Sequence, residues 1–142
     1  MRAILSLGSN IHPRREYIER ALDMLSTLPE TRLVAKSDLE ETEPQDVPAE
    51  FAHMKFLNMV AVFDTGLEVH EFSRAMHDIE DRLGRVRLVR NGPRTIDIDL
   101  IDFGGMRLQE KELTLPHPRA HLRTFVLSPL SRLGITLPMP IG

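Results

Sequence analysis

The chain has 142 residues, of which 42% are hydrophobic and 27% charged, a composition that fits one globular domain with a substantial core. Its formal net charge of −3 does not favour nucleic acid or an anionic membrane surface as a partner, and the absence of cysteine excludes disulfides, thiolate zinc sites and cysteine nucleophiles. No apolar run approaches the roughly 20 residues of a membrane span, and the N-terminus reaches Gly8 without a signal-peptide pattern, so we expect a cytoplasmic protein.

The first part of the chain predicts a strand over residues 2–7, a helix that begins near Pro13, and a second strand over 31–37. The helix is indicated by apolar residues at helical spacing, namely Ile18, Ala21, Leu22 and Leu25. Between strand and helix, the segment Gly8-Ser9-Asn10 could offer backbone amides to a phosphate, but a tight turn with a polar helix cap explains it equally well.

The middle of the chain predicts a long loop, a strand and a helix. Residues 40–55 are rich in glutamate and proline, and a loop of this length is usually a lid, a binding loop or a disordered link. Residues 56–63 predict a strand in which Asn58 is the odd polar residue, so its amide needs either backbone partners or the polar edge of a ligand. The helix follows from about 67 to 83. Its His77 and Glu80 share a flank that fits a solvated face as well as a ligand contact.

The segment over residues 94–100 is the most informative in the chain. Apolar residues alternate there with Asp97 and Asp99, the pattern of a strand with one apolar face. The two aspartates would point the same way, with Cα atoms about 6.5–7 Å apart, and would repel each other unless a cation lay between them. A solvated strand explains an isolated Asp-x-Asp. The nearby arginines favour a magnesium–polyphosphate site instead, and they occupy positions 85, 87, 90, 94, 119 and 123.

The last part of the chain predicts a turn at 102–105, short strands near 106–108 and 113–115, and a final strand over 124–127. His117 and His121 have a spacing that could place two zinc ligands on one helical face, but no third histidine or cysteine is near. Arg119 and Arg123 favour anion contact on the same segment. The predicted order is βαββαβ with additions, an α+β sheet covered by helices.

Six motifs occur in one order along nearly the whole chain. They are Leu7-Gly8-Ser9-Asn10, Phe56-Leu57-Asn58, Gly84-Arg85-Val86-Arg87, Gly92-Pro93-Arg94-Thr95-Ile96-Asp97-Ile98-Asp99, Pro116-His117-Pro118 and Arg123-Thr124-Phe125-Val126-Leu127. Together they resemble the 6-hydroxymethyl-7,8-dihydropterin pyrophosphokinase family, folate-pathway enzymes that move pyrophosphate from ATP to a pterin. The Gly-Pro-Arg-x-x-Asp-x-Asp motif is highly specific. The resemblance implies one domain over 1–142 with a ferredoxin-like fold, an antiparallel sheet with helices on its faces.

The resemblance also implies a role for individual residues. Two Mg²⁺ ions would bind Asp97 and Asp99, which with Arg85 and Arg94 would form the catalytic centre. The residues expected around the ATP nucleotide are His77, Glu80, Arg85, Arg87, Arg94, Thr114, His117 and Arg123. Those expected around the pterin are Phe56 and Phe125 on its two faces, Asn58 on its polar edge, and Thr42 and Pro44 on its rim. We expect a monomer whose partners are ATP and the hydroxymethyl dihydropterin.

The chemistry implied by the resemblance is positioning and charge neutralisation. The pterin hydroxymethyl oxygen would attack the β-phosphorus of ATP in line and AMP would leave, with no covalent nucleophile on the protein. The chain departs from the family where a tryptophan often precedes the Gly-Pro-Arg motif, because Asn91 stands there, and Glu112 stands where a basic residue would contact phosphate. We also expect weak order in the basic segment 85–93 and in the loop 40–55 without ligands.

Two alternatives from other classes stay open at this point. A metal-dependent phosphohydrolase would use the same aspartate pair to activate water and would need no pterin acceptor. A non-catalytic ligand-binding module would need neither Asp97 nor Asp99 as a pair and would bind without magnesium.

Overall fold

A computed structural model describes residues 1–43, 49–51, 54–84 and 95–137. The main helices and strands follow the predicted order βαββαβ, with further elements added to it. In chain order they are β1 (Arg2–Ser9), α1 (Arg14–Ser26), β2 (Thr31–Lys36), β3 (Glu40–Thr42), the short 3-10 helix η1 (Ala49–Phe51), β4 (Phe56–Thr65), α2 (Val69–Arg82), β5 (Asp97–Phe103), β6 (Leu108–Gln109), β7 (Thr114–Leu115), the 3-10 helix η2 (Ala120–Leu122) and α3 (Thr124–Arg132).

The main sheet is antiparallel and has the order β2-β4-β1-β5, with β3 pairing along the remaining part of β4. The central strand β1 is paired on both sides. Gly8 is opposite Asn58 of β4 and also opposite Asp97 of β5. Because β5 is paired on one side by β1, it forms the edge of this sheet. A separate hairpin of β6 and β7 packs beside it.

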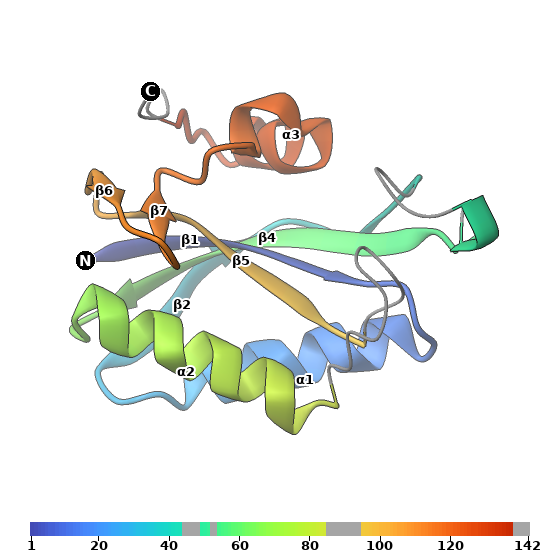
Figure 1. The fold of residues 1–142 in the computed structure, drawn as a ribbon, viewed down its shortest axis with the longest axis horizontal. Coiled ribbons are helices and arrows are strands. Elements are labelled where there is room, and N and C mark those ends of the chain that lie inside the picture. Colours follow the sequence, from blue (N-terminus) through green and yellow to red (C-terminus); the bar gives the residue numbers. More distant parts are fainter. Residues whose placement is uncertain (44–48, 52–53, 85–94, 138–142) are drawn as a thin grey trace.

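The sheet has a helix layer on each face (Figure 1). Helices α1 and α2 cover one face, and their apolar stripes pack against alternate residues of the strands, among them Leu5, Ala61 and Ile98. Helix α3 lies over the other face, where a smaller core contains Ile4, Val60, Val62, Ile101, Ala120, Val126 and Leu130. This mixture of helices and antiparallel strands is an α+β architecture.

Helices α1 and α2 lie where the sequence predicts them. Pro13 is the N-cap residue of α1, and the buried stripe of that helix is the predicted one. Glu68 caps α2 by accepting hydrogen bonds from the backbone N–H groups of His70 and Glu71. Gly84 follows α2 with a φ of 82°, a left-handed conformation that glycine adopts without the steric cost of a Cβ.

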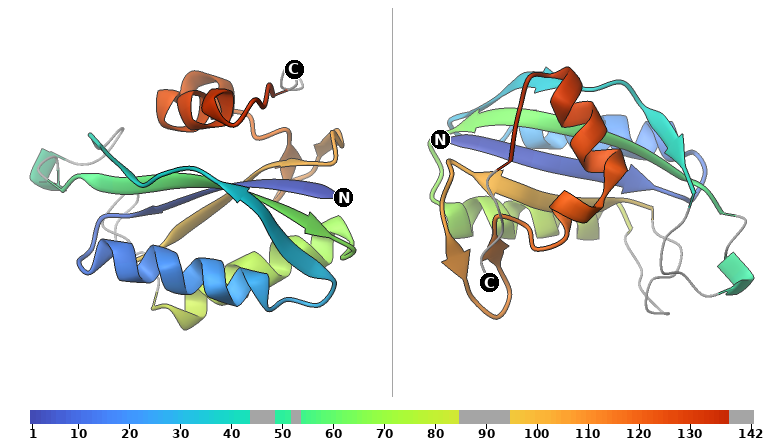
Figure 2. Two further views of the ribbon diagram at one scale, coloured as in Figure 1. Left: turned by 180° about the vertical axis from the view of Figure 1, so that it is seen from behind. Right: turned by 90° about the horizontal axis from the view of Figure 1, so that it is seen from above.

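The predicted strand over 124–127 is wrong, because these residues form the first turn of α3. Val126, Pro129 and Leu130 are its buried residues and have helical spacing. The helix crosses above the strands, and an ion pair between Arg132 and Glu40 joins its last turn to β3 (Figure 2). The predicted loop over 40–55 is wrong at its start, because residues 40–42 pair with β4 as a strand.

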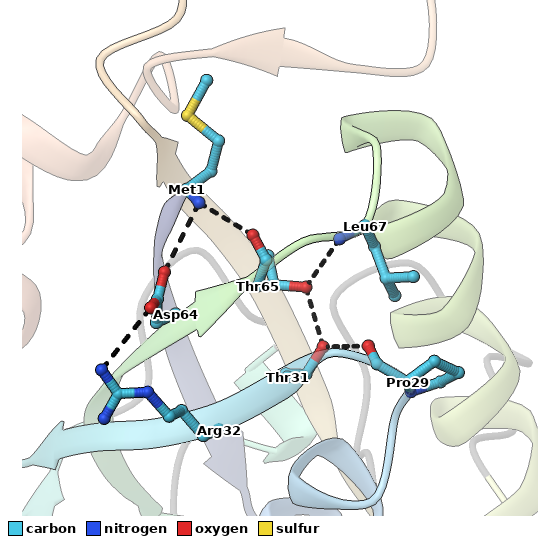
Figure 3. A network of polar contacts seen from close by, with 7 residues as sticks. All are labelled: Met1, Pro29, Thr31, Arg32, Asp64, Thr65 and Leu67. Carbon is cyan, nitrogen blue, oxygen red and sulfur yellow. Dashed lines mark hydrogen bonds and ion pairs between the residues drawn. The ribbon is translucent and has the colours of Figure 1, made fainter.

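The end of the sheet that carries Met1 is tied together by polar contacts (Figure 3). The N-terminal amine donates to the Thr65 carbonyl oxygen at 2.8 Å, and the hydroxyl groups of Thr31 and Thr65 are 2.7 Å apart. Asp64 pairs with Arg32 at 3.6 Å. A surface hollow of about 600 Å³ lies here, but its polar groups largely bind one another. In the described part of the chain, none of the helices has the length and apolar character needed to span a membrane.

Candidate active site

Asp97 and Asp99 lie on the face of the sheet that α3 covers. Ile98 and Leu100 belong to the core beneath α1 and α2, so the alternation of a strand places the aspartates on the opposite face. Asp97 is opposite Gly8 and Asp99 is opposite Ser6 in the β1–β5 pair. The aspartates therefore lie at the end of β1 that leads into the Gly8-Ser9-Asn10 segment, far from the hollow at Met1.

Arg123 connects the aspartate strand to α3. This residue is the N-cap of α3, and its Nη1 lies 3.4 Å from Asp99 Oδ2. Its guanidinium carbon is 5.7 Å from the centre of the Phe125 ring, within the range of a cation–π contact. One side chain thus links a carboxylate of the sheet with an aromatic ring of the helix.

His117 lies close enough to Arg123 and Asp97 to sense both charges. Its backbone N–H donates to Ile101 O at 2.8 Å, which fixes the segment beside β5. Burial and the positive charge of Arg123 lower the pKa of His117 to about 4, and Asp97 opposes the shift. Its Nδ1 accepts the Arg119 backbone N–H at 3.1 Å, so the neutral ring carries its proton on Nε2. This N–H is a donor suited to an anionic oxygen.

A second group of predicted site residues lies next to the aspartates on the same face. Asn58 is buried, and its Nδ2 donates to the Thr42 hydroxyl group across the β3–β4 pair. Gly8 lies beside it, and a Cβ built on Gly8 would be 2.6 Å from Asn58 Oδ1 and 3.5 Å from the Phe56 ring. The Thr42 hydroxyl group is thus one of the hydrogen-bond partners that the Asn58 amide needs.

The close approach of Gly8 to Asn58 is not predicted by the sequence. The sequence pattern around Gly8 indicates only a turn or a phosphate loop. A signal appears once the first and third long strands are paired, because Gly8 is then opposite Asn58. The buried Asn58 amide and the neighbouring aromatic ring leave no room for a side chain at Gly8.

His77 and Glu80 come from the other side of the sheet, on α2. His77 is largely exposed, whereas Glu80 is 2% exposed. His77 Nδ1 is 3.0 Å from Glu80 Oε1, and Glu80 Oε2 accepts the backbone N–H of Ile98 at 2.8 Å. Glu80 therefore reaches the strand between the two aspartates from behind.

The remaining predicted residues are less informative. Thr114 begins β7, and its hydroxyl group donates to Glu110 O at 3.4 Å within its own hairpin. Glu112 is exposed between β6 and β7. Pro44, Arg85, Arg87 and Arg94 lie outside the described residues, as do Asn91 and the whole basic segment 85–93.

The aspartate pair has the donor chemistry of a magnesium site completed by a substrate. Across the ranges that the structure describes, no group of three or more histidine, cysteine, aspartate or glutamate side chains is arranged to hold a metal ion. Mg²⁺ keeps several waters and commonly binds through one or two carboxylates together with substrate phosphates. Asp97 and Asp99 fit that pattern, with Arg123 and His117 beside them for further phosphate oxygens.

Comparisons with known proteins identify the family of the chain. The family model described as 7,8-dihydro-6-hydroxymethylpterin-pyrophosphokinase matches residues 4–134. A 2-amino-4-hydroxy-6-hydroxymethyldihydropteridine pyrophosphokinase of Pseudomonas aeruginosa is 43% identical over 141 residues, covering 99% of this chain and 85% of that protein. Proteins of the same name from Bacillus subtilis and Haemophilus influenzae are each 36% identical, over 92% and 97% of this chain and 77% and 84% of their own lengths. The chain belongs to the 7,8-dihydro-6-hydroxymethylpterin-pyrophosphokinase family.

Proposed function

We propose that the α3-covered face of the sheet is where this chain transfers pyrophosphate from ATP to the hydroxymethyl group of 6-hydroxymethyl-7,8-dihydropterin. The family provides the reaction, in which ATP is the co-substrate and AMP and the pterin pyrophosphate are the products of a step in folate biosynthesis. The observation that carries the placement is the Arg123–Asp99 contact. This contact links one carboxylate of β5 with the segment of α3 that carries Phe125, which supports a single site on this face.

Asp97 and Asp99 would hold two Mg²⁺ ions on the phosphates of ATP. Bound there, the ions would neutralise charge on the transferring group and its leaving oxygen. The strand contributes rigidity, because both aspartates are fixed by the register of β5 against β1. The pairing of Asp99 with Arg123 implies an exchange of partners when magnesium–ATP binds, since the arginine is then available to phosphate.

His117 and Arg123 would contact the phosphates directly, together with Arg85, Arg87 and Arg94. The imidazole donates from Nε2 without adding a full positive charge at neutral pH. Arg85 and Arg94 would act with the aspartates at the reacting phosphate, and His77 and Thr114 are proposed as further nucleotide contacts. Glu80, also expected there, is buried behind β5. The role of these residues is to orient the β-phosphorus and to stabilise spreading charge, which requires no covalent step on the protein.

The pterin would lie between Phe56 and Phe125, beside Asn58. Flat aromatic rings favour a stacked heterocycle, and the absence of a side chain on Gly8 lets Asn58 lie between the two strands without a clash. Asn58 would bind the polar edge of the pterin through Oδ1, since its Nδ2 already donates to Thr42. Thr42 and Pro44 would form the rim.

We also propose that the fold is ferredoxin-like and that residues 1–142 form one pterin pyrophosphokinase domain, monomeric and cytoplasmic, without a nucleic-acid or membrane partner. Support for the fold comes from the strands β1, β2, β4 and β5, which with α1 and α2 follow the order βαββαβ and lie in the spatial order β2-β4-β1-β5.

The reaction is tested by incubating the protein with ATP, Mg²⁺ and 6-hydroxymethyl-7,8-dihydropterin. AMP should form only when the pterin is present, and the pterin pyrophosphate should form in equal amount. AMP or inorganic phosphate formed at the same rate without pterin would instead indicate the phosphohydrolase, an alternative that the family match does not support. Binding of ligands without turnover in the presence of magnesium would indicate the non-catalytic module.

A further inference from the structure

A buried carboxyl group on α2 lies directly behind the aspartate strand. Glu80 is 2% exposed, and both of its oxygens have partners in the structure. Oε1 is 3.0 Å from His77 Nδ1, one turn earlier on the helix, and Oε2 accepts the Ile98 N–H at 2.8 Å. Burying a carboxyl group is costly unless it is well hydrogen-bonded, so a polar residue at this core position calls for a specific reason.

The amide that Glu80 binds belongs to an edge strand. Along such a strand, alternate backbone N–H groups face away from the sheet and need a partner when they are buried. β5 is paired by β1 on one side, and α2 packs against it. Glu80 provides the acceptor for Ile98 that a further strand would otherwise provide.

The position of this amide within β5 is what connects Glu80 to function. Ile98 stands between Asp97 and Asp99, and its side chain is buried in the core beneath α1 and α2. The Glu80 bond and this side chain together fix one residue, while the aspartates on either side of it point to the other face. Any tilt or slip of Ile98 would change the separation and direction of both carboxylates.

We propose that Glu80 is a positioning residue for the aspartate pair: it holds the Ile98 amide from behind so that Asp97 and Asp99 keep the geometry that binds magnesium–ATP. The proposal rests on the proposed function, because it takes the two aspartates as metal ligands. It differs from the role that the family resemblance implies, which is contact with the nucleotide. What matters in the positioning role is the reach of the side chain to Ile98, more than its charge.

Reach and charge can be separated with two conservative variants. Glu80→Gln keeps the length of the side chain and an acceptor oxygen for Ile98, and its amide N–H can face His77 Nδ1. Glu80→Asp keeps the carboxyl group but is one methylene shorter, so it cannot reach His77 and Ile98 together from the same helix position. Glu71→Asp, an exposed position of the same helix, controls for the effect of aspartate on the helix itself.

The first measurement is hydrogen exchange of the Ile98 amide in the protein without metal or nucleotide. Exchange should be about tenfold or more faster in Glu80→Asp than in the wild type, and within about threefold of the wild type in Glu80→Gln and Glu71→Asp. Equal exchange in the wild type and Glu80→Asp would overturn the proposal. This readout does not depend on turnover, so it remains valid even if the proposed reaction is wrong.

The second measurement is the magnesium dependence of AMP formation at saturating ATP and pterin. The magnesium concentration for half-maximal rate should rise about tenfold in Glu80→Asp and stay within about twofold in Glu80→Gln.

The affinity for an ATP analogue with a methylene group between the α- and β-phosphates, measured at saturating magnesium, should change little in either variant. A clear loss of this affinity in both variants would indicate direct nucleotide contact and overturn the proposal. Loss of thermal stability in Glu80→Asp with unchanged magnesium dependence would show a purely structural role and would also overturn it. Failure of the wild type to form AMP would count against the proposed function alone.

Discussion

Gly8 and Asn58 face each other across β1 and β4 at a distance that excludes any side chain on Gly8. A Cβ at this position would lie 2.6 Å from Asn58 Oδ1, closer than such atoms approach in folded proteins. Gly8 is also opposite Asp97 on its other side. One residue without a side chain therefore lies between the group proposed for the pterin and the group proposed for magnesium–ATP.

Gly8→Ala should displace the Asn58 side chain and break its bond to Thr42. Because Asn58 is buried, the freed amide would lose hydrogen bonds, and the added methyl group would also approach the Phe56 ring. We expect pterin affinity to fall by about tenfold or more, with a change of less than about twofold for ATP, measured by calorimetry. Gly66→Ala is the matched control, since a Cβ there would lie 3.1 Å from the Glu30 side chain at the other end of the sheet. It should leave pterin affinity unchanged, and a similar loss in both variants would refute the specific role of Gly8.

Asp97→Ala and Asp99→Ala should each reduce pyrophosphate transfer by about a thousandfold or more, since each would remove a proposed magnesium ligand worth several kcal/mol in the transition state. The fold should be retained, because neither side chain belongs to an apolar core and removing both relieves repulsion in the metal-free protein. Asp64→Ala, at the exposed far end of β4, serves as the control and should retain activity. Near-normal turnover by either site variant would rule out the two-metal assignment.

Phe125→Ala should weaken pterin binding by about 0.5–1.5 kcal/mol through lost stacking, with a further loss from reduced burial. ATP binding should weaken less, although the ring lies 5.7 Å from the Arg123 guanidinium. Phe125→Leu keeps most of the apolar contact with the small core and should lose only the stacking component. Equal losses for ATP and pterin in calorimetry would mean that Phe125 supports α3 as a whole and has no specific role in the pterin site.

Acid should destabilise the protein through His117. Burial and Arg123 lower its pKa to about 4 in the folded state, whereas the unfolded chain protonates near 6.5. Between these values the unfolded chain binds more protons, so the stabilisation is complete above about pH 6.5 and is lost as the pH falls toward 4. The free energy of unfolding should fall by about 1–3 kcal/mol over this range in urea titrations. His117→Gln should remove this part of the pH dependence, and an unchanged slope in that variant would assign the effect to other groups.

The sequence predicts the main sheet because its strands carry strong local signals. The alternation around Asp97 and Asp99 identifies both the strand and the face of the aspartates, since strand geometry leaves two choices and Ile98 selects one. The sequence predicts a loop at β3 because Glu40, Glu41 and Thr42 have no apolar pattern, and the strand conformation of these residues depends on pairing with β4.

Helix α3 was predicted as a strand for a different reason. Phe125, Val126 and Leu127 are a short apolar run, and Pro129 suggested an end to regular structure. The proline is instead tolerated inside the helix, and the buried positions 126, 129 and 130 have the helical spacing that would have identified it. The contact of Glu80 with Ile98 is not evident from the sequence either, because nothing in it indicates that a side chain of α2 reaches a backbone amide of β5.

The two cores on either side of the sheet differ greatly in size, and the site lies against the smaller one. α3 is held by Val126 and Leu130 and by the surface ion pair of Arg132 with Glu40, whereas α1 and α2 share an extensive apolar layer. Heating should therefore loosen α3 before it disrupts the helices beneath the sheet. Activity would be lost at a lower temperature than secondary structure, and substrates that bridge α3 and the strands would close this gap by binding only the docked state.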